Sequence, residues 1–268
     1  MKFSIITPTF NSSSSIRDCA YSVIKQQYDD YEHIIVDNVS SDDTVKILKE
    51  LYRDAGKEDK LIILSEKDNG ISDAFNKGIA KALGNVVVIL NSDDVFADTL
   101  LFSKNADIFM NEKILFTHGN IYFADDKFGS NIRRPLLCPI TSAMPFNHPG
   151  MFIRKSVYEK FGVYDTDYRY AMDYELICRY EKQIPDFRAH GHYFSGEPIA
   201  IMNSGGASWS SGIDCIKEIK KLLKKNQFWT LSARISYCFF LARIQTRDIL
   251  SKLGLDIIVV KWRQRKWE

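Results

Sequence analysis

The sequence predicts an α/β fold, a doubly wound and mostly parallel sheet flanked by helices, followed by a C-terminal helical extension. In the first hundred residues, short apolar runs alternate with segments whose apolar residues recur at helical spacing, which is the pattern of repeated β-α-β units. Hydrophobic residues make up 45% of the 268 residues and charged residues 26%, so the chain can form a large core and is neither disordered nor collagen-like. No apolar run reaches the ~18–20 residues that a membrane span needs.

Four short apolar runs in the first hundred residues are expected to be strands. They are Phe3–Thr7, His33–Val36, Leu61–Leu64 and Val86–Leu90. The fourth run is continuously apolar, as expected for a parallel strand that is buried on both faces. Between the runs, apolar residues recur at helical spacing in three segments, 16–24, 44–52 and 71–82. These segments predict the helices that connect the strands.

The pattern is less regular after residue 110. We expect a strand in the run ILFTHGNIYF at 114–123, short helices at Ser156–Phe161 and Asp173–Tyr180, and a strand at Pro198–Met202. Two further helices are expected at Ile213–Lys225 and Trp229–Leu253. The chain therefore divides into an α/β domain over residues 1–212 and a helical tail over residues 213–268.

Charge is distributed unevenly between these two parts. The whole chain has a formal net charge of +2, but residues 213–268 contain thirteen Lys and Arg against five Asp and Glu, a net +8. The first 212 residues are therefore mildly acidic, which suggests separate roles for the two parts. Five scattered cysteines without a CxxC spacing, and a start at Met1 without a secretory signal, lead us to expect a cytoplasmic protein with neither disulfides nor a zinc site.

Polar residues follow each predicted strand, where parallel sheets bind their ligands. Asp93 and Asp94 directly follow the most apolar strand, and adjacent carboxylates repel unless a cation or hydrogen-bond donors neutralise them. Oxygen ligands suit Mg²⁺ or Mn²⁺ bridging to phosphates. The alternative is that Ser92 or Asp93 caps the next helix. Asp37 and Asp68, which follow other strands, favour a site for a metal and a diphosphate.

Several motifs, taken in order, resemble the inverting glycosyltransferases of family two, which have the GT-A fold. The motifs are TPTFN (7–11), VDNVSSDDT (36–44), EKDNGISDAFNKGIAKALG (66–84), LNSDD (90–94), NHPGMFIRKSVYEKFGVYD (147–165) and AMDYELICRY (171–180). Each motif alone is weak, but their order and structural context make the resemblance specific, and it covers roughly residues 2–205. The chain is particularly similar to the bacterial enzymes that build lipopolysaccharide O-antigen, capsule or exopolysaccharide.

The resemblance implies a donor nucleotide site formed by the residues that match the family's motifs: Thr7, Pro8, Thr9, Asp37, Asp68, Gly70, Asp73 and Asn91. Asp37 would accept a hydrogen bond from the base, which is usually uracil in this family. Asn38 and Val39 replace the commoner Asp-Gly after this acid, which leaves the choice of base less certain. Asn91 replaces the first acid of the family's DXD metal motif and adds no charge to the site.

The resemblance also implies a metal ligand and a catalytic base. Asp93 is the expected ligand of Mn²⁺ or Mg²⁺, with Asp94, His190 and His192 as candidate further ligands, although an HxH pair shares one face of a strand for structural reasons too. Asp173 would take the proton from the acceptor hydroxyl. It lies at a predicted helix start, where the helix dipole favours the carboxylate, and simple helix capping is the alternative.

His148 in the NHPG motif takes a position where the family often has a histidine that faces the active site. It could contact the acceptor or the diphosphate, and a histidine with a purely local role in its loop is the alternative. Neither interpretation follows from the spacing alone.

The tail contains basic amphipathic helices. Lys217, Lys220, Lys221 and Lys224 share one helix face, and aromatic and Arg residues alternate in the second helix. Such helices suit an anionic membrane surface, and helices packed on the catalytic domain are the alternative. We expect a peripheral location on the inner face of the cytoplasmic membrane and no nucleic-acid partner, because no nucleic-acid-binding fold is recognisable.

These expectations combine into one function. Residues 1–212 would form the GT-A catalytic domain, with a nucleotide-sugar half (1–110) and an acceptor half (111–212). The enzyme would move a sugar from a nucleotide-diphosphate donor, most simply a UDP-sugar, to a hydroxyl of a glycan or lipid-linked glycan in cell-surface polysaccharide synthesis. A sugar-nucleotide pyrophosphorylase is the first alternative, but TPTFNSSSS lacks the Gly and Lys of its phosphate loop. A non-catalytic glycan-binding scaffold is the second, and retention of Asp37, Asp93 and Asp173 argues against it.

Overall fold

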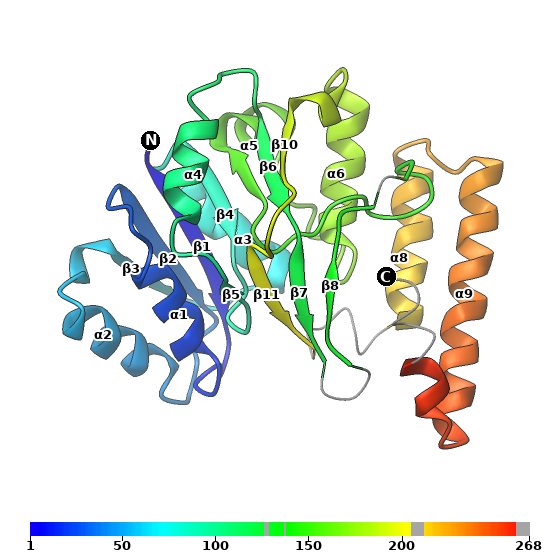
Figure 1. Ribbon diagram of the computed structural model, residues 1–268, viewed down its shortest axis with the longest axis horizontal. Coiled ribbons are helices and arrows are strands. Elements are labelled where there is room, and N and C mark those ends of the chain that lie inside the picture. The colour runs from blue at the N-terminus through cyan, green and yellow to red at the C-terminus, as the bar shows by residue number, and fades with distance from the viewer. Residues whose placement is uncertain (126–128, 137, 205–211, 261–268) are drawn as a thin grey trace.

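The computed structural model describes residues 1–125, 129–136, 138–204 and 212–260. Within these residues, a large central sheet lies between two layers of helices, a smaller sheet adjoins it, and two long helices stand at one side (Figure 1). This arrangement confirms the predicted α/β class with a C-terminal helical extension.

The larger sheet has seven strands in the order β10-β6-β9-β4-β1-β2-β3 among the described residues. Its parallel core consists of β1 (Phe3–Thr9), β2 (Tyr31–Asp37), β3 (Leu61–Ser65) and β4 (Val86–Ile89). Strand β9 (Phe152–Arg154) is antiparallel to β4 and to β6 (Phe116–Gly119), and β10 (Gly191–Phe194) is parallel to β6. The sheet is therefore mostly parallel, and the carboxyl ends of β1–β4 meet at one edge.

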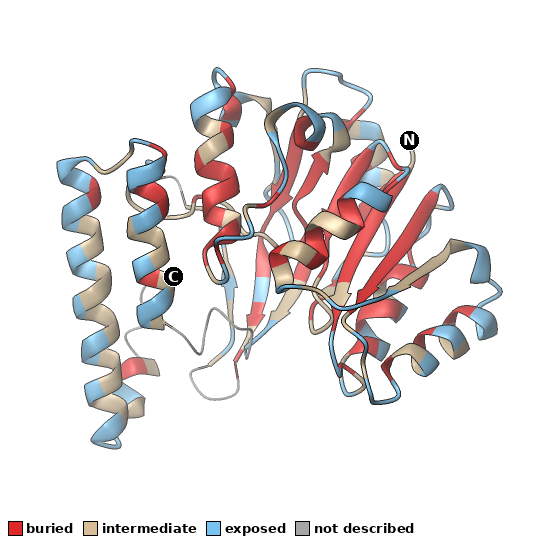
Figure 2. Ribbon diagram, turned by 180° about the vertical axis from the view of Figure 1, so that it is seen from behind, coloured by how far each residue is buried: buried red, intermediate tan, exposed pale blue. Residues whose placement is uncertain are grey.

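Helices cover both faces of this sheet because neighbouring residues of each strand point to opposite sides. Ile5 of β1 belongs to a core formed with α1 (Ile16–Ile24), α2 (Thr44–Asp54) and α4 (Leu101–Ile108). Ile6 belongs to the other core, which is formed with α3 (Ile71–Lys81), α5 (Lys155–Phe161) and α6 (Met172–Gln183). Short 3₁₀ helices occur at η1 (Glu58–Lys60) and η2 (Phe187–His190). The strands are largely buried, as Figure 2 shows.

The expected single strand over 114–123 is wrong, because this run forms two strands in different sheets. The chain leaves β6 at Gly119, passes through the buried Asn120 and enters β7 (Ile121–Ala124). Asn120 uses its side chain to bind the Gly196 carbonyl (2.8 Å) and the Tyr193 hydroxyl (2.6 Å). Strand β7 joins the smaller sheet, whose order is β5-β11-β7-β8, with β5 (Val95–Phe96), β8 (Asn131–Arg133) and β11 (Ala200–Asn203). The run ILFTHGNIYF contains no proline that would reveal such a switch.

Both predicted tail helices are present, and the first of them is part of the core. Helix α8 (Gly212–Lys225) lies against α6 and buries Ile216, Leu222 and Leu223. Helix α9 (Leu231–Lys252) packs on α8 at the outside of the molecule (Figure 1). Among its described residues only Ala233 is buried. Residues 256–260 are also helical. None of the helices in the described ranges is long and apolar enough to cross a membrane.

Candidate active site

A cleft of about 510 Å³ opens at the carboxyl ends of β1–β4. Its wall comes from the loops after these strands, together with the segment before β9, the start of α6 and the end of β11. The polar lining residues are Thr9, Asn11, Ser12, Ser14, Ser15, Asn38, Asp68, Asn91, Ser92, Asp93, Asp94, His148, Asp173 and Asn203. This edge is where open α/β sheets bind their ligands, and it unites polar segments that lie far apart in the sequence.

Five of the eight predicted donor-site residues line the cleft, namely Pro8, Thr9, Asp68, Gly70 and Asn91. Gly70 directly precedes α3 with φ of 116°, a conformation that L side chains rarely adopt. Its N–H is bound by the Asp68 carboxylate at 2.9 Å. Position 70 therefore requires glycine, and Asp68 holds the turn that starts the helix.

Thr7 and Asp73 are not among the described residues that line the cleft. The Thr7 hydroxyl is fully buried and lies 2.8 Å from Nε2 of His33, whose Nδ1 is 2.5 Å from the Tyr52 hydroxyl. Asp73 accepts a hydrogen bond from the Asn69 N–H (3.0 Å). Thr7 therefore joins β1 to β2, and Asp73 holds the loop before α3.

Asp37 is fully buried beneath the cleft and also does not line it in the described chain. Its carboxylate accepts hydrogen bonds from the hydroxyls of Thr9 (3.1 Å), Ser40 (2.5 Å) and Ser65 (2.6 Å). The neighbouring Asn38 lines the cleft instead, and its Oδ1 accepts the Asp68 N–H at 3.0 Å. Asp37 therefore holds the loop after β2, and its contact with a base stays a prediction.

The departure from the commoner Asp-Gly has a structural consequence at Val39. Val39 has φ of 55°, in the left-handed region that glycine adopts without strain. A β-branched residue there is a genuine outlier, and such a conformation costs of order 1–3 kcal/mol. The loop after β2 therefore keeps the shape that glycine would permit, at a cost in backbone strain.

Asp93 and Asp94 form an acid pair that lines the cleft, with Asp94 buried and Asp93 partly buried. Burial raises the pKa of Asp93, and burial followed by the charge of Asp93 raises the pKa of Asp94 to about 8. The Asn91 amide opposes this by donating to Asp94 Oδ2 at 3.1 Å, while its own Oδ1 is buried with no hydrogen-bond partner among the described residues. Two carboxylates and an unpartnered amide oxygen fit a hard divalent cation, which takes oxygen ligands. Asn91, Asp93 and Asp94 are therefore the residues that would hold Mg²⁺ or Mn²⁺.

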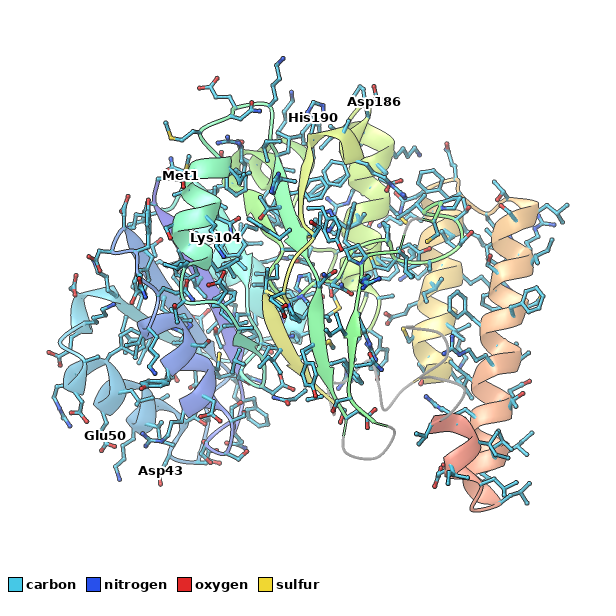
Figure 3. All side chains as sticks on the ribbon, viewed as in Figure 1. Met1, Asp43, Glu50, Lys104, Asp186 and His190 are labelled. Atoms are coloured by element: carbon cyan, nitrogen blue, oxygen red, sulfur yellow. The ribbon has the colours of Figure 1, made fainter. Side chains whose placement is uncertain are left out.

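His190 and His192 are not among the described lining residues, so the geometry does not support them as further ligands. Strand β10 begins at Gly191, so His190 belongs to the preceding η2, where its Nδ1 lies 2.9 Å from the Lys113 carbonyl. Figure 3 shows His190 at the end of the sheet where Met1 lies, which is the amino end of β1. No group of three or more His, Cys, Asp or Glu residues in the described ranges is arranged to hold a metal. Any remaining ligands would come from phosphate oxygens and water.

Asp173 is the second residue of α6, and its side chain, 27% exposed, lines the cleft. Its Oδ1 lies 3.1 Å from Nε2 of His148 but makes no hydrogen bond of good geometry within the described structure. The same His148 nitrogen lies 2.9 Å from the Tyr164 hydroxyl. Burial raises the pKa of Asp173, and the charge of His148 opposes the shift. The two residues predicted from the NHPG and AMDYE motifs thus lie together in the cleft.

The model of the family described as "Glycosyl transferase family 2" matches residues 4–172. The chain belongs to glycosyl transferase family 2. This confirms the resemblance on which the site residues were predicted, and the match ends one residue before Asp173.

Relatives of this family 2 glycosyltransferase include proteins of similar length. A "PGL/p-HBAD biosynthesis glycosyltransferase" of Mycobacterium bovis is 26% identical over 271 residues, which is 98% of each chain. Among solved structures, TarS 1–349 of S. aureus in complex with UDP-GlcNAc has a TM-score of 0.62 at 20% identity, covering 94% of this chain and 76% of that one. This chain spans 43% of the longer TarS structure and 65% of another TarS 1–349 structure.

The mannosyltransferase PcManGT of Pyrobaculum calidifontis, in complex with GDP-Man and Mn²⁺, has a TM-score of 0.61 at 13% identity, covering 98% of this chain and 79% of that one. At these identities the solved structures establish the shared GT-A fold.

Two parts of the glycosyltransferase site were not predicted from the sequence. Asn203, at the end of β11, donates from Nδ2 to the Asp93 carbonyl at 2.6 Å, so it ties the acidic loop to a strand from the second half of the chain. The hydroxyls of Ser12 and Ser92 lie 2.9 Å apart and join the loops after β1 and β4. The local sequence around Ser12 and Asn203 gives no signal of these contacts, because their partners are 80 and 110 residues away.

Proposed function

We propose that this glycosyltransferase performs an inverting, metal-dependent transfer of a sugar from a nucleotide-diphosphate donor, most simply a UDP-sugar, to a hydroxyl group of a glycan or lipid-linked glycan. The observation that carries the proposal is that one cleft holds the acid pair Asp93 and Asp94 together with Asp173. The UDP-GlcNAc complex of TarS supports the donor class, and the mycobacterial relative, whose name is "PGL/p-HBAD biosynthesis glycosyltransferase", supports a role in biosynthesis.

The charge of the cleft supports metal dependence. Asp68, Asp93, Asp94 and Asp173 line it, while none of its described lining residues is Lys or Arg. A diphosphate would be repelled by these carboxylates, so a cation must accompany it. When bound, Mg²⁺ or Mn²⁺ would neutralise negative charge on the departing diphosphate. A pyrophosphorylase would need basic residues around its phosphates, which this lining does not supply.

Asp173 is proposed as the general base. The acceptor hydroxyl attacks the anomeric carbon on the face opposite the leaving diphosphate, and its proton passes to the carboxylate of Asp173. Burial raises the pKa of Asp173, which increases its affinity for this proton. Because the diphosphate is displaced from the anomeric carbon in a single substitution, no nucleophile of the protein is required and the configuration of that carbon inverts. His148, 3.1 Å away, is placed to stabilise the charge of the carboxylate before transfer.

The membrane component of the proposal concerns the outer face of α9. Leu231, Phe239 and Leu253 are 73%, 73% and 66% exposed, and Ile235 and Ile249 continue the apolar surface between them. Trp229, in contrast, is partly buried and packs against the core. The occupant that we propose is an anionic lipid surface, because residues 213–268 have a net charge of +8 and each Lys or Arg near such a surface contributes about 1 kcal/mol. Docking there would bring a lipid-linked acceptor of cell-surface polysaccharide synthesis to the cytoplasmic enzyme.

The central test is nucleotide release from a panel of UDP- and GDP-sugars, with and without Mn²⁺. We expect slow hydrolysis of at least one UDP-sugar that requires the metal and becomes faster when the correct acceptor is added. Binding of UDP in the presence of Mn²⁺, measured by calorimetry, should accompany it. If neither UDP nor GDP binds and no donor is hydrolysed, the transferase proposal is wrong and the scaffold alternative is favoured.

A further inference from the structure

We propose that Glu218, on the tail helix α8, is a positioning residue for Asp173, so that α8 is part of the catalytic apparatus. This inference rests on the proposed function, in which Asp173 is the base. Glu218 lies outside the range of the family match, which ends at residue 172, and is not among the described residues that line the cleft.

The Glu218 carboxylate binds three consecutive backbone N–H groups immediately before α6. Oε1 accepts from Arg169 at 2.9 Å, and Oε2 accepts from Tyr170 and from Ala171, both at 2.8 Å. Hydrogen bonds to an ionised acceptor are roughly twice as strong as neutral ones. Asp173 follows Ala171 by two residues, so the anchored backbone leads directly into the residue that carries the base.

Helix α6 needs such an anchor because it has no local cap. Its N-cap is Ala171, and no side-chain cap hydrogen bond is present there in the described structure. The N-terminus of a helix carries unsatisfied N–H groups and a partial positive charge, both of which favour a nearby carboxylate. Glu218, 47 to 49 residues further along the chain, supplies that carboxylate.

The segment 164–171, which leads into α6, is held from two sides. On one side, α3 binds it through Ser72, which donates to the Tyr168 carbonyl at 2.8 Å, and through Asn76, which donates to the Tyr164 carbonyl at 2.8 Å. On the other side, α8 contributes Lys221 as well as Glu218. The ammonium of Lys221 lies 4.7 Å from the centre of the Tyr168 ring. Lys225 forms an ion pair with Asp165.

Both members of the Asp173–His148 pair depend on this segment. Tyr164 at its start contacts His148 Nε2 at 2.9 Å, and Ala171 at its end leads into Asp173. Catalytic groups must be held within about 0.5 Å of their productive positions, and a misplacement of about 1 Å can cost about 10²-fold in rate. Loss of the Glu218 carboxylate should therefore reduce turnover without removing any group from the donor site.

The experiment compares E218A and E218Q with D214N, a control that removes an exposed carboxylate from the same helix. We expect E218A to lower kcat about 10- to 100-fold while the dissociation constant of UDP–Mn²⁺ changes less than twofold. E218Q, which keeps one acceptor oxygen, should be intermediate, and D214N should equal the wild type. Equal losses of kcat and UDP affinity in E218A would overturn the inference.

A double-mutant cycle with D173N separates positioning from general destabilisation. If Glu218 acts through Asp173, E218A should have little further effect on the residual rate of D173N, because residues that act as a unit are non-additive. An equal fold-loss in both backgrounds would show that Glu218 only stabilises the fold, and would refute the positioning role.

Amide hydrogen exchange tests the inference independently of activity. In E218A the amides of Arg169, Tyr170 and Ala171 should lose protection, while those of β1 keep theirs. Unchanged protection would overturn the inference even if the enzyme transfers sugar as proposed. Conversely, lost protection in a protein without transferase activity would show that the anchor exists and that the proposed function has failed.

Discussion

Replacing Asp173 with asparagine separates the chemical role of this residue from its structural one. Asparagine has nearly the same shape but cannot take up the proton of an acceptor hydroxyl. General-base catalysis typically contributes about 10²–10⁴-fold, so the loss in kcat should correspond to about 2.7–5.4 kcal/mol of transition-state stabilisation, at 1.36 kcal/mol for each factor of ten. The affinity for UDP–Mn²⁺ should stay within about twofold, because a base is needed mainly in the transition state.

The structure also predicts the effect of this substitution on stability. Burial raises the pKa of Asp173 in the folded protein, so the native state holds this proton more tightly than the unfolded chain does. The resulting destabilisation is absent below the unfolded pKa, grows as the pH rises towards the folded pKa, and is fully present above it. Asparagine removes the penalty, so the Tm of D173N at pH 7 should equal or exceed that of the wild type, even though the contact with His148 is altered.

The assay combines initial rates of product formation, calorimetric UDP binding and thermal unfolding on both proteins. For the wild type, the acid limb of kcat against pH should have its midpoint above the ordinary value for Asp, about 3.9, and D173N should lack this limb. A D173N rate within tenfold of the wild type would refute the base assignment. A parallel loss of UDP affinity and turnover, or a markedly lower Tm, would show that Asp173 is a donor ligand or a structural residue.

Three other outcomes test the metal site, the packing of α3 and the surface of α9. EDTA should abolish transfer, and Mn²⁺ should restore it in the wild type but not in D93A. The control D54A, which removes an exposed carboxylate, should behave as the wild type. Full activity in the presence of EDTA would exclude a metal role. Gly78→Ala should lower the unfolding free energy by about 1–3 kcal/mol, because a Cβ there would lie 2.3 Å from Ile6 Cγ2. Gly196→Ala, which meets no described atom within 4 Å, should leave the Tm unchanged, and equal Tm values for both variants would show that α3 can shift. Replacing Phe239 and Leu253 with serine should weaken co-sedimentation with anionic liposomes, most clearly at high salt. The control Met110→Ser, at an equally exposed site, should leave co-sedimentation unchanged. If the intact protein does not bind anionic liposomes at low salt, the docking proposal is wrong.

The sequence by itself determined the parallel core of the fold and the position of its ligand-binding edge. The periodicities of the first hundred residues predict β1 to β4 and α1 to α3, because each element buries one face whose spacing is visible locally. The acid pair Asp93 and Asp94 was equally visible, since polar residues that end an apolar strand must lie at the carboxyl edge of a parallel sheet. The motifs added Asp173 and His148, which the structure places together in the cleft.

Only the tertiary structure decided which of these residues face the cleft. Thr7 belongs to the same motif as Pro8 and Thr9, and Asp37 to the same motif as Asn38. The pairing of β1 with β2, and of β2 with β3, nevertheless places hydrogen-bond partners around Thr7 and Asp37 and buries both. His190 is excluded because η2 places it at the amino end of the sheet. The contact of Glu218 with the residues before α6 joins positions 47 to 49 residues apart. Local spacing carries no record of such pairings, because they are selected by the packing of whole elements against one another.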